Sequence, residues 1–242
     1  VSGFADAEPF IEPANLPDAL LLLANAQRQL KQFAPAVDTY SRVLTIAPDS
    51  SFAADARYWR LVCSYNLEVP HLPVEVDEFL GSNPKPAERD NAILMKAEFL
   101  RLRKDYQSAA VAYGEAVKSK ELKSERRSEA LLRWSECAVL IGDPQQTINA
   151  TTQLLAAAPN HPLAAKALFW RAETQRRTKA TVAAERDYAE IVNKYRDSAD
   201  RETALKQIAL LRGEQNDHAG MSANYEKLLA DYPKSDSRAE AH

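Results

Sequence analysis

The sequence has few of the residues that interrupt helices or carry redox and metal chemistry. Its 242 residues include six glycines, two cysteines, two methionines and four histidines. With hydrophobic residues at 45% of the total, this composition is typical of a well-packed helical protein and not of a disordered chain.

A strong net charge and a long apolar run are also missing. The formal net charge is −3, and the local groups of Lys and Arg alternate with Asp and Glu. We therefore expect no nucleic-acid partner. No apolar run approaches the ~20 residues of a membrane span, so we expect no transmembrane segment in this sequence. Residue 1 is not methionine and no signal peptide is visible, which leads us to expect that the sequence is part of a longer gene product.

What the sequence does contain is a repeat. Residues 52–60 match residues 163–171 at six of nine positions if tyrosine is allowed for phenylalanine, and each stretch follows a proline at the same distance. The alanine inside this stretch recurs at steps of 36 to 38 residues, at Ala19, Ala56, Ala92, Ala130, Ala167, Ala204 and Ala241. A near-constant period of this length indicates a solenoid of repeated units.

Helical periodicity divides each unit into two helices, so we predict an all-α chain of about six helix hairpins. Residues 1–16 contain two prolines and lack that periodicity, so they are predicted to form an extended lead-in that could lie against the first helix pair. The array covers residues 17–242, in repeats at about 17–50, 51–85, 86–121, 124–160, 161–197 and 198–234, with the start of a seventh at 235–242.

Two positions recur inside the units. The first helices carry a small residue at Ala24, Ala97, Ser135, Ala172 and Ala209, with Leu61 as the exception. The second helices carry an aromatic residue at Tyr40, Tyr113, Tyr188 and Tyr225, with Asp77 and Thr151 as the exceptions. We expect the small residues to let two helices approach closely and the aromatic residues to fill the space between hairpins.

The second repeat is irregular. Its first helix is predicted over Phe52–Leu67, but Pro70, Pro73 and the stretch 81–84 confine its second helix to Val74–Leu80. Cys63 and Cys137 fall at equivalent places two repeats apart. At that separation a disulfide is excluded by its ~7 Å limit between Cα atoms, and we expect two buried thiols.

These residues resemble the tetratricopeptide repeat over residues 17–242. Ala36, Tyr40, Val43 and Pro48 follow its second half in the first repeat, and further matches lie at Ala109, Tyr113, Ala116, Tyr225 and Pro233. The sequence departs from the family in its period of about 37 rather than 34 residues and in lacking the glycine of the first helix. The resemblance implies a right-handed α–α superhelix that serves as a protein-interaction scaffold.

The long junctions between units, such as residues 48–56 and 231–241, are similar to those of cell-envelope tetratricopeptide-repeat proteins of bacteria. The Tol-Pal coordinator and the barrel-assembly lipoprotein have junctions in this style. This resemblance implies a location in the bacterial periplasm or cell envelope, with the cytoplasm as the alternative.

Groups that could support catalysis are sparse. The four histidines, His71, His161, His218 and His242, stand apart from one another and from acidic pairs, so no metal-ligand spacing is present. A glycine-rich phosphate loop and a nucleophile motif are also absent. We predict no catalytic residue, no cofactor, no metal and no enzymatic activity.

A superhelix of hairpins has a concave face lined by its first helices, and we expect a peptide or partner domain to bind there. The predicted partner-binding residues flank the buried small positions: Arg28, Tyr58, Tyr65, Glu98, Arg101, Glu136, Phe169, Glu173, Arg176 and Arg177. Weaker candidates at similar positions are Asn25, Val62 and Lys206. Aromatic and arginine side chains often dominate the binding energy of interfaces.

Other interpretations stay open at this point. Tyr58 and Phe169, each followed by a tryptophan, could pack between hairpins. The glutamates could form salt bridges with Arg101, Arg133 or Arg176 between adjacent hairpins, which stabilise by ~0–1 kcal/mol each. Two alternative functions are a self-assembling module that forms homo-oligomers through its repeat ends and a helical accessory domain of a larger enzyme. Sequence beyond either end would distinguish the second from a scaffold.

Overall fold

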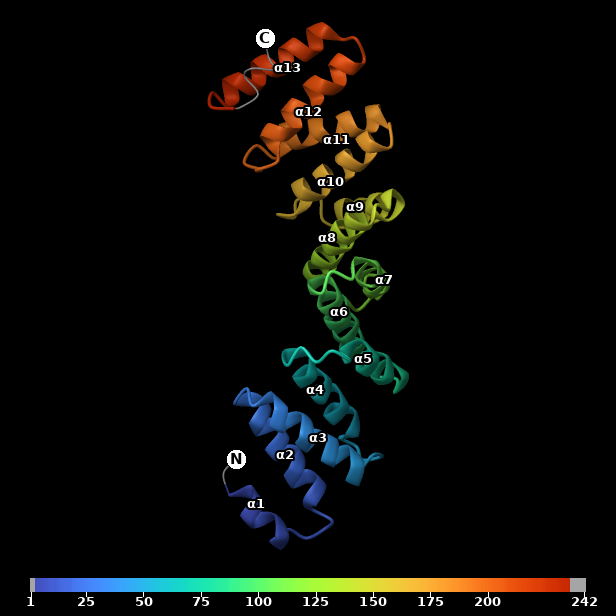
Figure 1. Cartoon of the computed structure of the whole chain (residues 1–242), viewed down its shortest axis with the longest axis vertical. Helices are drawn as coiled ribbons and strands as arrows, with labels where there is room; N and C mark the ends of the chain where they lie inside the picture. The colour runs from blue at the N-terminus through green and yellow to red at the C-terminus, as the bar shows by residue number, and fades with distance from the viewer. Residues whose placement is uncertain (1–2, 236–242) are drawn as a thin grey trace. The chain divides into compact units, whose positions relative to one another are not determined.

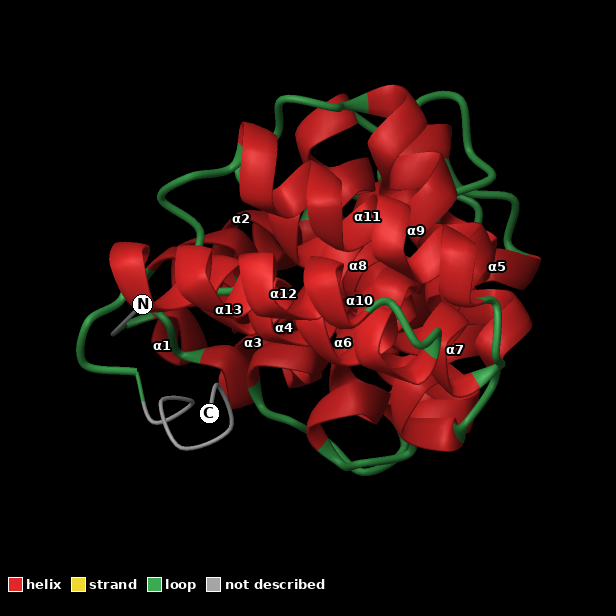
Figure 2. Cartoon of the chain, turned by 90° about the horizontal axis from the view of Figure 1, so that it is seen from above, coloured by secondary structure: helices red, strands yellow, loops and turns green. Residues whose placement is uncertain are grey.

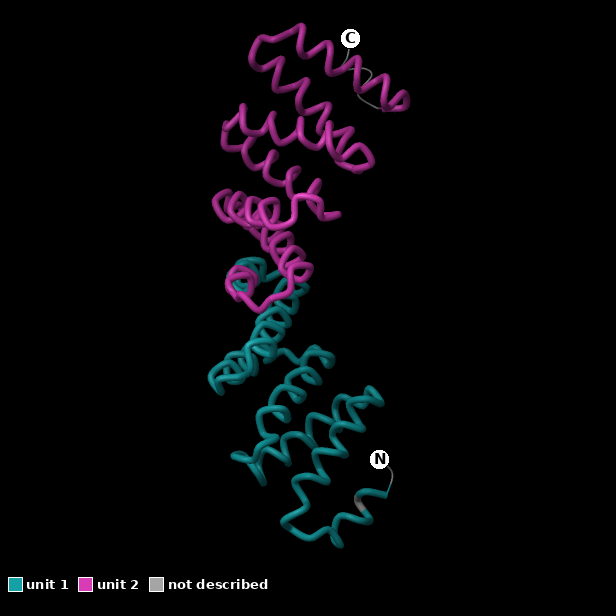
Figure 3. The backbone as a smooth tube through the Cα atoms, turned by 180° about the vertical axis from the view of Figure 1, so that it is seen from behind, with its two compact units in different colours: residues 1–112 teal, residues 113–242 magenta. Residues whose placement is uncertain are grey.

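The computed structural model describes residues 3–235, except for the side chain of Ala5, and within them every regular element is a helix (Figure 2). The chain divides into two compact units, residues 1–112 and 113–242 (Figure 3). The predicted all-α array of helix hairpins is confirmed. The start of the predicted seventh repeat, with Ala241, lies outside the described residues apart from Ser235.

Unit 1 contains two complete hairpins and the first helix of a third (Figure 1). Hairpin 1 is the pair α2 and α3, and hairpin 2 is the pair α4 and α5. The helices are α1 (Phe4–Ala7), η1 (Glu8–Phe10), α2 (Leu16–Gln29), α3 (Phe33–Ile46), α4 (Ala53–Asn66), α5 (Leu72–Gly81) and α6 (Pro86–Leu102). The next helix, α7 (Tyr106–Ala116), contains the boundary between the units.

Unit 2 continues with three complete hairpins, numbered 4, 5 and 6. Their helices are α8 (Ser124–Ile141) and α9 (Pro144–Ala157), α10 (Ala164–Arg177) and α11 (Thr181–Lys194), and α12 (Arg201–Glu214) and α13 (His218–Asp231). Within this unit α8 packs on α9 and on α10, and α11 packs on α12, so successive hairpins share one continuous apolar interior.

The prediction of an extended lead-in at residues 1–16 is wrong. Residues 4–7 form one α-helical turn and residues 8–10 a 3-10 turn. Phe4 packs against the cluster of Leu20, Ala24 and Tyr40, and Glu8 forms an ion pair with Arg42 of α3. A four-residue helix shows too little periodicity to be recognised in a sequence, whereas the exposed side of the first hairpin offers Phe4 an apolar surface.

The first helices all end in the same turn. In each, a residue with positive φ follows the helix, its N–H bonds back to the carbonyl three residues earlier, and the next N–H reaches five residues back, which is the Schellman pattern. The residues with positive φ recur at the period of the repeat, at Lys31, Glu68, Lys104, Gly142, Lys179 and Asn216. Five of these six are not glycine, so the repeat imposes a left-handed conformation that their side chains disfavour.

The recurring positions predicted from the sequence form the core. All six residues of the small position, from Ala24 to Ala209 and including Leu61, are buried, and so are the four tyrosines of the second helices. The anchoring alanine is buried from Ala56 to Ala204, but Ala19 is half-exposed because no complete hairpin precedes α2 in the described chain.

The second helix of hairpin 2 is longer than predicted but still the shortest second helix in the described chain. It covers Leu72–Gly81, ten residues, where α3, α9, α11 and α13 each have 14. Pro73 stands in the first turn, where a missing N–H costs no hydrogen bond. Leu72, Val76 and Phe79 are buried against the neighbouring first helices.

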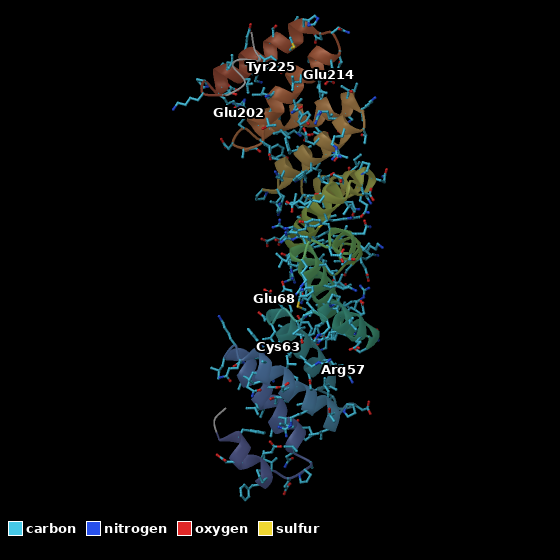
Figure 4. The ribbon with its side chains drawn as sticks, viewed as in Figure 1. Arg57, Cys63, Glu68, Glu202, Glu214 and Tyr225 are labelled. Carbon is cyan, nitrogen blue, oxygen red and sulfur yellow. The ribbon has the colours of Figure 1, made fainter. Side chains whose placement is uncertain are left out.

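Both cysteines are buried thiols outside any disulfide, as predicted. Cys63, which projects from α4 (Figure 4), has its pKa raised to about 11 because burial disfavours the thiolate. A thiol with that pKa is protonated at neutral pH and therefore a poor nucleophile.

Candidate functional site

The predicted partner-binding residues all lie on first helices, between α2 and α10. Every one of them is half-buried except Arg177, which is exposed. Each therefore offers part of its surface to solvent while packing on its own unit.

In unit 1, Arg28 of α2 is held by three side chains. Its guanidinium carbon lies 3.8 Å from the ring centroid of Trp59, and its Nε donates to the hydroxyl of Tyr40 at 3.3 Å. That hydroxyl in turn donates to Oδ1 of Asn25 at 2.7 Å. Burial raises the pKa of Tyr40, and the positive charge of Arg28 opposes that shift. An arginine that is already stacked and hydrogen-bonded has little conformational freedom left to lose on binding.

Tyr58 of α4 is chiefly a packing residue. Its ring centroid lies 5.0 Å from that of Trp59 and 5.9 Å from that of Phe79, and its hydroxyl accepts a hydrogen bond from Asn91 Nδ2 at 3.1 Å. These contacts link α4 to α5 and α6. They agree with the alternative that such aromatic pairs pack between hairpins.

Tyr65, Glu98 and Arg101 come together where α4 and α6 end. Arg101 binds Glu98 through two hydrogen bonds, Nη2 to Oε1 at 2.5 Å and Nε to Oε2 at 3.0 Å. The pKa of Tyr65 is raised, first by burial and then by the negative charges of Glu98 and Glu68. The charges of Glu98 and Arg101 therefore act on the pKa of Tyr65 in opposite directions, Glu98 raising it and Arg101 lowering it.

Beside this group lies a pocket of about 300 Å³ that sequence reasoning missed. Tyr65, Phe99, Leu102 and Arg103 line it, and the guanidinium of Arg103 stacks 4.5 Å above the ring of Phe99. Arg103 also donates to the backbone carbonyl of Glu68, a residue labelled in Figure 4, at 3.2 Å. Leu102 is 61% exposed, so the wall contributes apolar surface that a partner could cover.

In unit 2, Glu173 of α10 is the centre of a second group. It accepts a hydrogen bond from Arg176 Nη2 at 3.0 Å and another from the hydroxyl of the fully buried Tyr188. Burial raises the pKa of Tyr188 above its ordinary value, and the charge of Glu173 raises it further. The ring of Phe169 lies 6.3 Å from that of Tyr188, so Phe169 packs on this group and also borders the surface.

The two groups have the same construction. Asn25 and Glu173 occupy the same place in their repeats, and an arginine follows each of them three residues later. In each hairpin a buried tyrosine of the second helix donates a hydrogen bond to this residue, Tyr40 to Asn25 and Tyr188 to Glu173. We call each set a tyrosine-anchored triad: Asn25, Arg28 and Tyr40 in hairpin 1, and Glu173, Arg176 and Tyr188 in hairpin 5. The sequence showed that these positions recur with the repeat, but it did not show the hydrogen bonds between their side chains.

Glu136 departs from this construction. Its tyrosine is replaced by Thr151, whose hydroxyl donates to its own helix, and its ion-pair partner is Arg133, three residues before it, at 2.9 Å. The three predicted glutamates therefore all pair with arginines, as one alternative anticipated. The pairs lie within one helix rather than between adjacent hairpins.

Arg177 stands apart from the triad of hairpin 5. It lines a small pocket of about 140 Å³ together with Gly142, Asp143, Thr147 and Thr174. Asp143 caps α9 by accepting from the N–H of Gln146 at 3.0 Å, which lowers the pKa of that carboxyl group. The cap orders the turn that borders Arg177.

Sequence reasoning also missed a buried ion pair in hairpin 5. Arg171 donates from Nε and Nη2 to the two carboxylate oxygens of Asp187, at 2.6 and 2.9 Å, and from Nη1 to Thr152 at 3.2 Å. Asp187 is fully buried. One signal was available, because Arg171 ends the stretch that the sequence repeats, and its counterpart there is Arg60.

The described residues hold no cluster of three or more His, Cys, Asp or Glu side chains suited to a metal ion. Their helices include none with the length and apolar character needed to cross a membrane. The groups on the first helices are instead arginines, carboxylates and aromatic rings in fixed pairs. Such a surface can bind by hydrogen bonds, ion pairs and stacking.

Comparisons with known proteins agree with this architecture. The tetratricopeptide-repeat family model matches residues 18–50, which is hairpin 1. A search among curated protein sequences gives no match.

Two solved structures share the fold. A signal-transduction ATPase with a tetratricopeptide-repeat sensor, from Pyrococcus horikoshii, is 15% identical with a TM-score of 0.57; the match covers 95% of this chain and 38% of that one. MamA from Desulfovibrio magneticus RS-1, from residue 41 to its end, is 14% identical with a TM-score of 0.53; the match covers 76% of this chain and 97% of that one. At these identities the likeness concerns the fold alone. Hairpin 1 thus matches the tetratricopeptide-repeat family model, and the chain has the fold seen in tetratricopeptide-repeat proteins.

Proposed function

We propose that the chain is a non-catalytic scaffold that binds a peptide or partner domain on the face formed by its first helices. The tetratricopeptide-repeat fold implies a protein-interaction scaffold in general. The more specific proposal, a binding face on the first helices, is carried by one observation, the tyrosine-anchored triad that recurs in hairpins 1 and 5.

The triads support binding because they hold polar side chains at a surface in fixed positions. Immobilising a flexible side chain on association costs about 0.5–1.5 kcal/mol, and an arginine that is already stacked or paired loses less. Arg28 is held by Trp59 and Tyr40, and Arg176 by Glu173. Both arginines keep part of their surface exposed.

The charges of this face favour a peptide that itself carries both signs. Glu98, Glu136 and Glu173 each stand beside an arginine, so these three places on the face carry both signs. A polyanion such as a nucleic acid would meet a carboxylate next to every one of these cations, which is unfavourable. A peptide with mixed charges could pair with both members of each ion pair.

Charge reversal of one arginine in each unit tests the proposal. Peptides that bind the wild type are selected from a phage-displayed library and then titrated against the wild type and the variant Arg101→Glu/Arg176→Glu. The matched control, Arg196→Glu/Lys227→Glu, changes the net charge equally at exposed residues outside the first helices. We expect the selected peptides to bind the wild type and the control alike and the first variant at least about tenfold more weakly. Equal binding to all three would refute the proposed face.

We also propose that this scaffold belongs to a larger protein of the bacterial cell envelope. The support is the style of the long junctions between repeats, such as residues 48–56. Fractionation of cells that express the complete gene product with a C-terminal tag tests this proposal. Recovery of the tagged protein with cytoplasmic markers alone would contradict it.

A further inference from the structure

The stretch that the sequence repeats ends in an arginine both times, but only one of the two arginines has a partner. Arg171 of hairpin 5 is paired with the buried Asp187. The place of Asp187 in hairpin 2 is taken by Val76, which is buried and apolar. Among the described residues, no hydrogen bond or ion pair holds Arg60. Hairpin 2 therefore has the arginine of hairpin 5 but not the carboxylate that pairs with it.

Arg60 borders a pocket of about 310 Å³ that lies wholly within unit 1. The pocket is formed by α3, α4 and α5, and its walls include Leu44, Arg57, Arg60, Leu61, Glu75 and Phe79. Arg57, labelled on α4 in Figure 4, is fixed by donating to the carbonyl of Pro48 at 2.8 Å. The helix α5 that forms one wall has ten residues, where α3, α9, α11 and α13 have 14.

A second polar group of the same pocket lacks a partner. Glu75 binds His71 Nε2 through Oε1 at 2.8 Å, but its Oε2 is buried and no donor among the described residues reaches it. That oxygen has no surface that a ligand could reach, so it is not available as an acceptor. Glu78 also lines the pocket, is exposed, and its side chain has no hydrogen bond or ion pair with a described residue. The pocket therefore offers an unpaired cation, Arg60, and an unpaired anion, Glu78.

We propose that this pocket binds a small zwitterion, an α-amino acid with an apolar side chain. Its carboxylate pairs with Arg60, its ammonium group pairs with Glu78, and its side chain packs on Leu44, Leu61 and Phe79. The carboxylate takes the role that Asp187 has beside Arg171 in hairpin 5.

The charge balance of the walls supports a ligand that carries both signs. Glu75 and Glu78 both line the pocket, so two arginines face two glutamates. A simple anion would be repelled by the glutamates and a simple cation by the arginines, whereas a zwitterion satisfies both. Charge-assisted hydrogen bonds at both ends are about twice as strong as neutral ones and also fix the ligand's orientation.

This site differs from the face proposed above for a partner protein. The two share no residue, and the pocket includes second-helix residues that the partner-binding prediction did not use. The two proposals can therefore fail independently. A variant that loses amino-acid binding should still bind selected peptides.

Calorimetric titration of the full chain with L-leucine tests the inference, with two modified ligands as controls. N-acetyl-L-leucine lacks the ammonium group and L-leucinamide lacks the carboxylate. We expect L-leucine to bind and each modified ligand to bind at least about tenfold more weakly. No heat of binding with L-leucine, or equal binding of the amide, would overturn the proposal. Tighter binding of the acetylated ligand would also overturn it, since that result would assign the pocket to the C-terminus of a peptide.

Two variants locate the binding. Arg60→Gln should weaken L-leucine binding at least about tenfold, while Arg196→Gln, at an exposed arginine of unit 2, should leave it unchanged. Val76→Asp restores the residue that hairpin 5 has at this place and should compete with the ligand's carboxylate for Arg60. Circular dichroism confirms that each variant is folded. Unchanged binding in a folded Arg60→Gln variant would place the ligand elsewhere and refute the site.

Discussion

Hairpins 2 and 5 begin with nearly the same nine residues and yet differ in what their second helices do. In hairpin 5, α11 has 14 residues and supplies Asp187 and Tyr188, which bind Arg171 and Glu173 of the first helix. In hairpin 2, α5 has ten residues, with Val76 and Asp77 at those places, and Arg60 faces an open pocket. The first helix thus defines the repeat, whereas the second helix determines whether the polar side chains of the first helix find hydrogen-bond or ion-pair partners within the hairpin.

The largest effect is expected at the buried ion pair of hairpin 5. Asp187→Val gives hairpin 5 the residue of hairpin 2 and leaves Arg171, only 13% exposed in its side chain, without its carboxylate. Removing one partner of a buried pair typically costs about 3–5 kcal/mol. We expect a loss of stability of that size in urea denaturation followed by circular dichroism.

The double variant Arg171→Leu/Asp187→Val is the control for this prediction. Because it removes both charges, it should recover most of the lost stability. If the single variant is as stable as the wild type, the pair in hairpin 5 contributes nothing and the contrast with hairpin 2 is lost.

The two tyrosine-anchored triads should differ in strength. Tyr188 donates to the carboxylate of Glu173, whereas Tyr40 donates to the neutral amide of Asn25. Tyr188→Phe should therefore cost about 1.5–3 kcal/mol and Tyr40→Phe about 1 kcal/mol of unfolding free energy. Equal losses in the two variants would contradict this ranking.

The same tyrosine makes a prediction about alkaline pH. Because the folded protein raises the pKa of Tyr188, its contribution to stability is complete below the pKa of the unfolded chain, about 10, and is lost as pH rises further. The difference in stability between the wild type and Tyr188→Phe should accordingly shrink above that pH. A difference that stays constant would argue against a protonated Tyr188.

A smaller effect is expected at the helix caps. Asp143 caps α9, while the corresponding Gln32 of α3 makes no side-chain cap. Asp143→Ala should cost about 1 kcal/mol, and Gln32→Asp should stabilise hairpin 1 by a similar or smaller amount. The folded protein lowers the pKa of Asp143, so the contribution of this cap is present above the ordinary aspartate pKa and is lost as pH falls through the lowered value. Thermal unfolding at neutral and acidic pH measures both effects.

The smallest effects are expected at the residues of positive φ. Gly142 has a φ of 75° and Lys179, at the same place one repeat later, a φ of 62°. Gly142→Ala should cost about 1 kcal/mol, whereas Lys179→Gly should stabilise by about 0.5 kcal/mol because glycine has no Cβ to strain. Lys179→Ala is the matched control and should be nearly neutral. Stabilisation by Gly142→Ala together with destabilisation by Lys179→Gly would show that the left-handed turn is not what limits these positions.

Much of the fold was predictable because the repeat is a local pattern. The period of the alanines showed which positions of the repeats are equivalent, and from these equivalences Ala172 and Tyr188 were correctly predicted to be core residues. The division of each unit into two helices also implied a turn between them, although Gly142 was the only glycine among the described residues of positive φ that end the first helices. The lead-in was predicted wrongly because its single helical turn is stabilised by contacts of Phe4 with hairpin 1 and not by its own sequence.

The candidate site was predictable only as a set of positions. The sequence placed Arg28 and Glu173 on first helices, but nothing in it indicated that Tyr40 and Tyr188 would hold them. The pocket beside Tyr65 and the pairing of Arg171 with Asp187 join residues from different helices. Such pairs show no periodicity unless they recur in every repeat, and these do not.

The sequence by itself thus determined the unit, its length, its two helices and the small and aromatic residues that pack them, because each depends on spacing along one chain segment. The tertiary structure decided which polar side chains are paired and which are left over, because pairing depends on distances between helices. Arg60 and Arg171 are indistinguishable in the repeated stretch. Only the packing of α5 and α11 shows that one is neutralised within the fold and the other faces a pocket.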